Sequence, residues 1–469
     1  MKRTKIVCTI GPACDQKETL TQMIKEGMNV ARFNMSHGTH ESHAAMIADV
    51  RAARAALGVP VSILIDTKGP EVRVGKFNGG KVELKAGQKF TLTTKNVLGD
   101  SSIVSINYNK LPSLVKKGTN ILLNDGYIML SVISTTATDI LTKVVHGGTL
   151  SDRKSVNVPG IDLQMPYISN QDKLDIEFAC KQKADFIAIS FVNCADDVLQ
   201  VKKLLAKYGR PQMKIISKIE SARGVDNAHE IMEESDGIMI ARGDLGVEID
   251  FAKIPVIQKE LIAHANAHGK LAITATQMME SMLTNPRPTR AEISDVANAI
   301  FDGTSCVMTS GETSAGAHPV LVVKTMAQII KQAEEKQTSD EFLFYQPDGT
   351  SFYGSLGYAT AALNYSLLPK AIITATKSGS SAIAVSHYRP ACTILGCTYE
   401  EDTYQLLAAY YGVMPMLRKK LTGMDSQIDD CVLAAKEAGI VKKGDRVVIT
   451  CGNATIRDGS NCLVVEKIK

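Results

Sequence analysis

The chain has 469 residues, too many for one ordinary hydrophobic core, and at about 150 residues per domain this length predicts roughly three domains. Hydrophobic residues make up 45% and charged residues 22%, and 53 basic residues are mixed with 49 acidic ones to a net charge of +4 without a basic block, which argues against a nucleic-acid partner. The ten cysteines are scattered and include no C-x-x-C pair, which is typical of a reducing compartment. The N-terminus lacks the apolar run of a signal peptide, and no run approaches the ~20 apolar residues of a membrane span. We therefore expect a cytoplasmic protein with no membrane partner.

One unit repeats along much of the chain: a short β-branched strand, a polar cluster at its end, and a stretch with helical spacing. The predicted strands lie at 4–10, 28–33, 61–66, 185–191, 214–220, 237–241, 271–276 and 306–310. The predicted helices between them include 17–26, 40–57, 198–207 and 254–268. Thr289 and Glu292 form the pattern of a capping box that opens a further helix. Eight strands of this kind predict an α/β fold, a (β/α)8 TIM barrel.

The repeat is interrupted after the third strand and ends before the last part of the chain. The interruption contains alternating β-type runs at 81–84, 89–93, 121–123 and 128–132. It predicts an inserted β-barrel lid domain, 69–171, that covers the catalytic face of a barrel made of 1–68 and 172–338. A polar stretch from 337 to 351 has the texture of a linker. Further strands at 371–374, 393–395, 413–416 and 446–450 alternate with helical patterns and predict a C-terminal open α/β domain, 339–469.

The densest chemistry lies in the segment 214–248. Its first strand ends in Lys218 and Glu220, which point to the same side because they are two residues apart. Its second strand ends in Arg242 and Asp244. An ammonium beside two carboxylates suits a divalent metal and an anionic substrate, as phosphoryl transfer requires. The alternative is a surface ion pair at a strand end.

Polar residues that follow other predicted strands weigh against that alternative, because the carboxyl ends of parallel barrel strands meet at one rim. Those candidates are Arg32, Asn34, Ser36, His37, Asp66, Thr67, Arg73, Gly243 and Thr276. Helix capping would account for Ser36 and Thr67 but poorly for Arg32 and Lys218.

Several blocks of the sequence closely resemble the pyruvate kinase family. They are CTIGP at 8–12, NVARFNMSHG at 29–38, LIDTKGPEVR at 64–73, ISKIE at 216–220, IMIARGDLGVE at 238–248, TATQM at 274–278, NPRPTRAE at 285–292 and DVANAIFDGT at 295–304. The resemblance runs through the barrel and the inserted domain and continues more loosely to the C-terminus. It implies the same architecture and transfer of a phosphoryl group from phosphoenolpyruvate to ADP, which gives ATP and pyruvate in glycolysis.

The resemblance also implies roles for the central residues. Glu220 and Asp244 would bind a divalent metal, Mg²⁺ or Mn²⁺, and Lys218 would stabilise the transferring phosphoryl group. The backbone at Gly243 and Asp244 would hold the substrate carboxylate. Thr276 would belong to the relay that protonates the enolate, although it also fits an ordinary β-branched strand residue.

A second group of residues resembles the phosphate and nucleotide contacts of the family. Arg32 and Arg73 would clamp the transferring phosphate and the nucleotide phosphates, as guanidinium groups do well. Lys154 would reach the nucleotide from the inserted domain when the lid closes. Asn34 and His37 would complete that side.

A third group resembles the monovalent-cation site of the family. Its oxygen ligands for K⁺ would be Asn34, Ser36, Asp66 and Thr67. Family members with a carboxylate at the position of Glu71 tend to need K⁺, whereas those with a lysine supply the charge themselves. The sequence therefore predicts K⁺ dependence.

In the C-terminal domain, a strand passes into a polar loop and a helix, a pattern typical of an anion cradle. The loop residues are Thr376, Lys377, Ser378, Gly379, Ser380 and Ser381. They resemble the family's pocket for a sugar-phosphate activator, and a plain strand-to-helix turn is the alternative. The stretch 451–460 departs from the family pattern and the chain has no Trp, so fructose 1,6-bisphosphate, AMP and other sugar phosphates all stay open.

Two other classes of function remain open. A barrel lyase or aldolase acting on pyruvate-type substrates would share the metal but would not need Arg73 or Lys154. A catalytically silent metabolite-binding protein could lose Lys218 or Thr276, yet both are present. The resemblance alone implies a homotetramer.

His264 and His268 lie one helical turn apart and could chelate zinc. No third ligand is evident nearby in the sequence. A solvated helix face is therefore the favoured interpretation.

Overall fold

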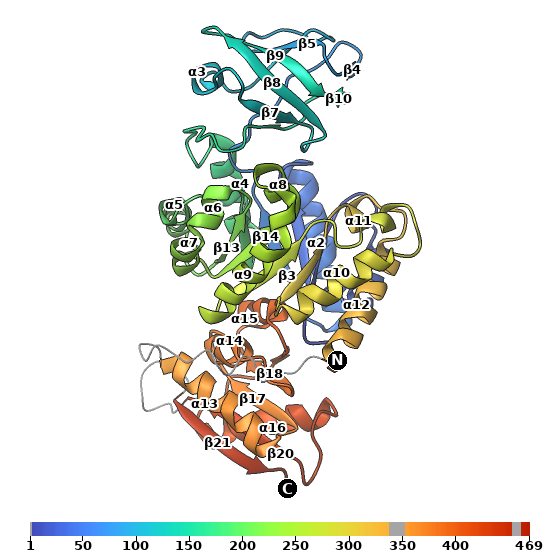
Figure 1. Ribbon diagram of the computed structural model, residues 1–469. Helices are drawn as coiled ribbons and strands as arrows, with labels where there is room; N and C mark the ends of the chain where they lie inside the picture. The colour runs from blue at the N-terminus through green and yellow to red at the C-terminus, as the bar shows by residue number, and fades with distance from the viewer. Residues whose placement is uncertain (1, 337–351, 453–460) are drawn as a thin grey trace.

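The computed structural model describes residues 2–336, 352–452 and 461–469, and it stacks three parts along one long axis (Figure 1). The inserted β domain, in teal, lies at one end, the barrel lies in the middle, and the C-terminal domain, in orange and red, lies at the other end. The linker predicted at 337–351 and the domain boundary predicted at 338/339 lie outside the described residues.

Eight parallel strands close into a barrel in the order β1-β16-β15-β14-β13-β12-β3-β2. Their bounds are β1 Lys5–Thr9, β2 Val30–Asn34, β3 Ser62–Asp66, β12 Phe186–Ile189, β13 Lys214–Ile219, β14 Gly237–Ala241, β15 Leu271–Ala275 and β16 Cys306–Thr309. The (β/α)8 fold is confirmed, and each predicted barrel strand overlaps an observed one. Because all eight strands run the same way, their carboxyl ends form one rim.

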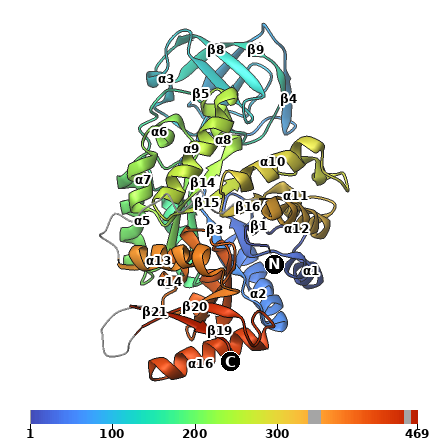
Figure 2. The ribbon, with the colours of Figure 1, turned by 60° about the horizontal axis from the view of Figure 1, so that its bottom comes forward.

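Helices wrap the outside of the barrel (Figures 1 and 2). They are α1 Lys17–Glu26, α2 His40–Leu57, α4 Asn170–Lys181, α5 Ala195–Lys207, α6 Ala222–Asp226, α7 Ala228–Glu234, α8 Arg242–Glu248, α9 Ile254–Ala267, α10 Arg290–Phe301, α11 Gly311–Ser314 and α12 Pro319–Lys336. The predicted capping box opens α10, because Thr289 Oγ1 accepts from the Glu292 N–H and the Glu292 carboxylate accepts from the Thr289 N–H. The predicted boundary at 171/172 falls within the first turn of α4.

The inserted domain is made of a six-stranded sheet in the order β11-β7-β8-β9-β5-β6 and the pair β10-β4. Its elements are β4 Lys81–Leu84, β5 Lys89–Thr93, β6 Ile103–Ser105, α3 Leu111–Leu114, β7 Asn120–Leu123, β8 Ile128–Thr135, β9 Asp139–His146, β10 Gly148–Ser151 and β11 Val156–Asn157. Alternating residues of these strands fill a core of their own. The domain lies above the carboxyl rim of the barrel (Figure 1).

The C-terminal domain has one open sheet in the order β19-β18-β17-β20-β21, with β21 antiparallel to β20. Its elements are α13 Phe352–Leu367, β17 Ala371–Ala375, α14 Ser380–His387, β18 Thr393–Thr398, α15 Glu401–Leu406, β19 Val413–Leu417, α16 Met424–Glu437, β20 Arg446–Cys451 and β21 Cys462–Lys467. The predicted open α/β domain is confirmed. Among the described residues, no helix combines the length and apolar character needed to cross a membrane.

The amino end of the barrel is joined to the C-terminal domain by buried polar contacts. Lys5 Nζ on β1 donates to the Val413 carbonyl at 2.6 Å, and the Arg389 guanidinium donates to the carbonyl oxygens of Gly303 and Thr304 at 2.9 and 3.2 Å. The amino end of the barrel therefore faces the C-terminal domain, and the carboxyl rim faces the inserted domain.

Candidate active site

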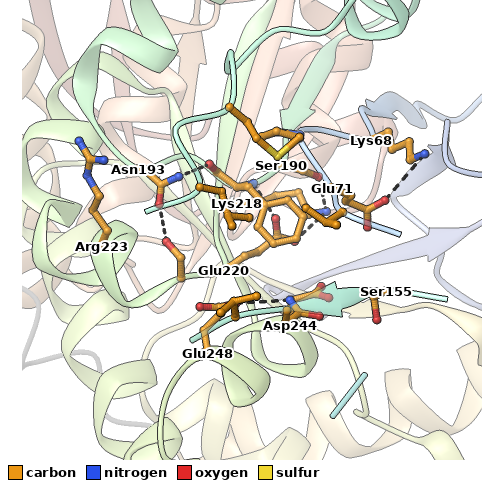
Figure 3. A pocket seen from close by; sticks show the side chains of 18 of the residues that line it. Lys68, Glu71, Ser155, Ser190, Asn193, Lys218, Glu220, Arg223, Asp244 and Glu248 are labelled. Atoms are coloured by element: carbon orange, nitrogen blue, oxygen red, sulfur yellow. Dashed lines mark hydrogen bonds and ion pairs between the residues drawn. The ribbon is translucent and has the colours of Figure 1, made fainter. Parts of the chain in front are cut away.

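A cavity of about 730 Å³ lies between the carboxyl rim of the barrel and the inserted domain. Figure 3 shows Lys218, Glu220 and Asp244 in its wall, with Glu71 and Ser155 contributed from the side of the inserted domain. The predicted site residues that line the cavity are Arg32, Asn34, Ser36, His37, Arg73, Lys154, Lys218, Glu220 and Asp244. Side chains from both parts of the chain thus enclose one space.

The Lys218 ammonium is held at the floor of the cavity by three acceptors. Its Nζ lies 2.7 Å from Ser190 Oγ, 2.9 Å from Glu220 Oε1 and 3.2 Å from Asp66 Oδ1. Burial lowers the pKa of Lys218, but the charges of Asp66 and Glu220 outweigh that effect and the net shift is upward. Lys218 therefore carries a fixed positive charge in a site where little water can screen it.

Glu220 and Asp244 lie close enough for the charge of Asp244 to affect the protonation of Glu220. Burial raises the pKa of both, against the opposing effect of the Lys218 charge, and the proximity of Asp244 raises that of Glu220 further. Glu220 Oε2 also accepts from the Phe191 N–H at 2.7 Å. Two buried carboxyl groups that affect each other in this way fit a divalent cation, whose charge would offset theirs.

The pair alone is an incomplete coordination sphere. No group of three or more His, Cys, Asp or Glu side chains in the described part of the chain is arranged to hold a metal. An ion at Glu220 and Asp244 would therefore take further oxygen ligands from water or substrate, as Mg²⁺ does at phosphate sites.

Arg32 and Asp66 form a buried pair on neighbouring strands. Arg32 Nε donates to Asp66 Oδ2 at 2.7 Å, and Arg32 Nη1 donates to Thr9 Oγ1 at 2.7 Å. Burial would raise the pKa of Asp66, but the charges of Lys218 and Arg32 outweigh it and hold the pKa below its usual range. Asp66 thus contacts both Arg32 and Lys218 and holds these two cations in place.

The residues predicted to bind K⁺ lie at the ends of β2 and β3, which are adjacent. Asn34 and Asp66 are partners in the strand register, and Asn34 Oδ1 accepts from the Ser36 N–H at 3.1 Å. Thr67 lies beside them and its Oγ1 donates to the Ala188 carbonyl at 3.3 Å, outside the lining of the cavity. The donor set consists of oxygens, so it fits a hard monovalent cation, although Asp66 is already shared between Arg32 and Lys218.

Gly243 and Thr276 lie beside the cavity rather than in its lining. The Gly243 N–H, in the first turn of α8, donates to Thr276 Oγ1 at 2.9 Å. Thr276 has a φ of 67°, an uncommon conformation for a β-branched residue. The Arg242 guanidinium holds it there by donating to the Thr276 carbonyl at 2.6 Å. The structure therefore brings these two residues to each other and leaves them at the edge of the enclosed space.

Arg73, predicted to bind nucleotide phosphates, is paired within the chain. Its Nε and Nη2 donate to the two carboxylate oxygens of Glu71 at 2.8 and 3.1 Å, and Lys68 Nζ lies 3.9 Å from Glu71 (Figure 3). Lys154 and His37 line the same cavity. Glu71 thus fixes the conformation of the Arg73 guanidinium group.

The site residues that follow β12 were not predicted from the sequence. Besides Ser190 and Phe191, Asn193 lines the cavity, and its Nδ2 donates to the Phe191 carbonyl at 2.9 Å. Phe191 has a φ of 53°, which turns its N–H toward Glu220. Ser190 could have been found from its position in the sequence, because a residue that directly follows a buried barrel strand lies at the carboxyl rim.

The predicted anion cradle lies in the C-terminal domain. It connects β17 to α14 through Gly379, which has a φ of 88° and whose N–H donates to Thr376 Oγ1 at 3.0 Å. Ser378 Oγ and Ser380 Oγ lie 2.9 Å apart. Within the stretch 451–460, residues 453–460 lie outside the described residues.

The fold and the site together define a class of protein. A (β/α)8 barrel with a buried ammonium, a carboxylate pair that fits a divalent cation, and an inserted domain that adds basic residues over the rim is a metal-assisted phosphotransferase. Comparison with protein families gives the particular one: "Pyruvate kinase, barrel domain" matches residues 1–323, and "Pyruvate kinase, alpha/beta domain" matches residues 355–466. The chain belongs to the pyruvate kinase family.

Individual relatives cover the whole chain. The pyruvate kinase of Clostridium acetobutylicum is 45% identical over 475 residues, and that of Clostridium perfringens is 41% identical over 474, each covering 100% of both sequences. A crystal structure of a pyruvate kinase from Cryptosporidium parvum has a TM-score of 0.94 and 38% identity, and the match covers 100% of this chain and 96% of that one.

Proposed function

We propose that the rim around Lys218 carries out the reaction of this family, transfer of the phosphoryl group of phosphoenolpyruvate to ADP, which gives ATP and pyruvate in glycolysis. The supporting observation is the position of the Lys218 ammonium, 2.9 Å from Glu220 and 3.2 Å from Asp66 on the wall of a cavity large enough for both substrates. The family uses metal ions. Mg²⁺ or Mn²⁺ at Glu220 and Asp244 is our assignment.

Each residue has a proposed part in the transfer. Lys218 and Arg32 supply positive charge where the equatorial phosphoryl oxygens crowd. Glu220 and Asp244 would hold a divalent cation, which would supply Lewis-acid charge at the site. Gly243 and Asp244 hold the substrate carboxylate at the first turn of α8. Thr276, whose Oγ1 accepts from the Gly243 N–H at the edge of the cavity, would belong to the relay that protonates the enolate carbon.

The nucleotide is proposed to bind between the rim and the inserted domain. Arg73 and Lys154 would contact its phosphates, with Asn34 and His37 on the barrel side. Arg73 is already paired with Glu71, so the nucleotide phosphates would either displace Glu71 from Arg73 or bind to Arg73 alongside it. An aldolase or lyase would have no use for these cations.

A coupled assay for pyruvate tests the proposal directly. With phosphoenolpyruvate, Mg²⁺ and K⁺ present, we expect pyruvate release to require ADP and to match ATP formation one to one. Release at the same rate without ADP would instead indicate lyase-type or hydrolytic chemistry. Absence of any turnover would favour a silent binding protein.

We also predict that activity depends on K⁺. The oxygens of Asn34, Ser36, Asp66 and Thr67 fit this ion. Residue 71 is a glutamate, paired with Arg73, so its side chain cannot supply the positive charge of K⁺ as a lysine would. Assays in which Na⁺ replaces K⁺ at equal ionic strength should lose most of the activity. Equal rates in the two salts would contradict the assignment, and E71K is expected to reduce the difference between them.

Other finer properties rest on the family resemblance. We propose that residues 376–381 bind the phosphate of an effector, a sugar phosphate or AMP, since the loop ends at the N-terminus of α14. A homotetramer and a cytoplasmic location are proposed on the same basis.

A further inference from the structure

Two histidine rings on neighbouring barrel helices face each other far from the catalytic rim. His229 lies on α7 and His268 directly follows α9, and these helices lie side by side near the C-terminal domain in both views (Figures 1 and 2). The two Nε2 atoms are 3.3 Å apart. Both side chains are exposed, so an ion from solution can reach them.

The second nitrogen of each ring has an acceptor of its own. His268 Nδ1 lies 2.8 Å from the His264 carbonyl oxygen, and because a carbonyl can only accept, Nδ1 carries the proton and Nε2 a lone pair. His229 Nδ1 lies 3.7 Å from Glu233 Oε1, and this attraction favours a proton on that nitrogen too. In the neutral rings, each Nε2 then has a lone pair, and the two nitrogens are 3.3 Å apart.

The separation suits a shared metal ion. With Zn–N distances of about 2.1 Å, two nitrogens 3.3 Å apart subtend about 105° at the metal, near the tetrahedral angle. The rings are perpendicular, with centroids 4.8 Å apart, so their Nε2 edges meet without overlap. A direct N–H···N bond is the alternative, and 3.3 Å is long for it.

The surrounding groups resemble the outer shell of a metal site. A histidine ligand commonly donates its other N–H to a carboxylate or a carbonyl. The His264 carbonyl has this role for His268, and the Glu233 carboxylate lies 3.7 Å from His229 Nδ1, near it but beyond hydrogen-bond distance. His387 of the C-terminal domain is nearby, with its ring 3.7 Å from where a Cβ on Gly269 would lie. Burial, followed by the charge of Arg389, lowers the pKa of His387 to about 4, so this ring adds no positive charge at neutral pH.

We propose that His229 and His268 bind one divalent transition-metal ion, of which Zn²⁺ is the representative, with water completing the coordination. Imidazole nitrogens select such ions, whereas Mg²⁺ prefers oxygen ligands, so this site is chemically distinct from Glu220 and Asp244. The ion cross-links α7 to α9. Because it binds the folded chain and not the unfolded one, it stabilises the barrel.

Zn²⁺ titration by calorimetry on the full-length, EDTA-treated protein tests this, with saturating Mg²⁺ present to occupy Glu220 and Asp244. We expect wild type to bind one more Zn²⁺ per chain than the double variant H229N/H268N. Each single variant should bind at that site about tenfold more weakly or worse. The same Zn²⁺ should raise the Tm of wild type and leave that of the double variant unchanged.

H264N is the matched control, because the contact between His264 and His268 is made by the His264 backbone carbonyl, which this substitution keeps. It should bind Zn²⁺ like wild type. Equal stoichiometry in wild type and the double variant would overturn the proposal, and so would loss of binding in H264N, which would place the ion on α9 alone. Phosphotransfer with Mg²⁺ should be unchanged in all these variants and shows that each is folded.

Discussion

Replacing Lys218 by methionine is expected to lower kcat for phosphoryl transfer by about 10³-fold or more. The methionine keeps the length of the side chain but removes the charge that lies 2.9 Å from Glu220 and 3.2 Å from Asp66. The barrel should stay folded, because Asp66 keeps its pair with Arg32 and Glu220 can take up a proton. Pyruvate and ATP formation measure the loss, and circular dichroism checks the fold.

K214M is the matched control for this variant. Lys214 lies on the same strand, β13, but at the opposite end of the barrel, where it pairs with Asp236 at 2.8 Å. We expect K214M to retain kcat within about twofold, since a partly exposed ion pair contributes little. A K218M enzyme that keeps wild-type kcat would remove Lys218 from the mechanism.

The barrel could be predicted because each of its strands is a short, buried β-branched run that ends in polar residues. Inside the inserted domain the pattern was weaker. Strand β9 was missed, and its inward face includes Thr142, whose hydroxyl is satisfied by the Phe90 carbonyl at 2.7 Å. A polar residue at a core position hides the alternation on which such a prediction depends. Strand β21 was missed as well, and it is an antiparallel edge strand in an otherwise parallel sheet.

The central site residues could be placed at one rim because barrel topology fixes where strands end. Lys218 lies on β13, Glu220 directly follows that strand, and Asp244 lies in α8 just after β14. Strands β13 and β14 are neighbours in the barrel. Contacts between distant segments could not be predicted in the same way. The hydrogen bonds from the Arg73 guanidinium to the Glu71 carboxylate depend on side-chain rotamers. The pairing of His229 with His268 depends on how two helices pack. Neither follows from spacing in the sequence.

Replacing Glu220 by glutamine is expected to lower activity by about 10²-fold or more at moderate Mg²⁺, because it removes the charge of one of the two proposed metal ligands. Glutamine keeps the shape and can still accept from the Phe191 N–H. Added Mg²⁺ should raise the free energy of unfolding of wild type but not of E220Q. Thermal unfolding with and without Mg²⁺ measures this difference, and equal stabilisation of both proteins would contradict the metal assignment.

The pH dependence of stability gives E220Q an independent test without metal. Burial raises the folded-state pKa of Glu220 above its unfolded value, so stability from this group is present at low pH and is lost as pH rises through the folded pKa. Between about pH 5 and pH 8, the unfolding free energy of E220Q should therefore fall less than that of wild type.

D185N is the control for this test. Burial also raises the pKa of Asp185, to about 7, but this carboxyl lies at the amino end of β12 and accepts from the Ile63 N–H. D185N should show the same flatter pH profile while it keeps the Mg²⁺-dependent activity, because Asp185 lies outside the proposed metal site.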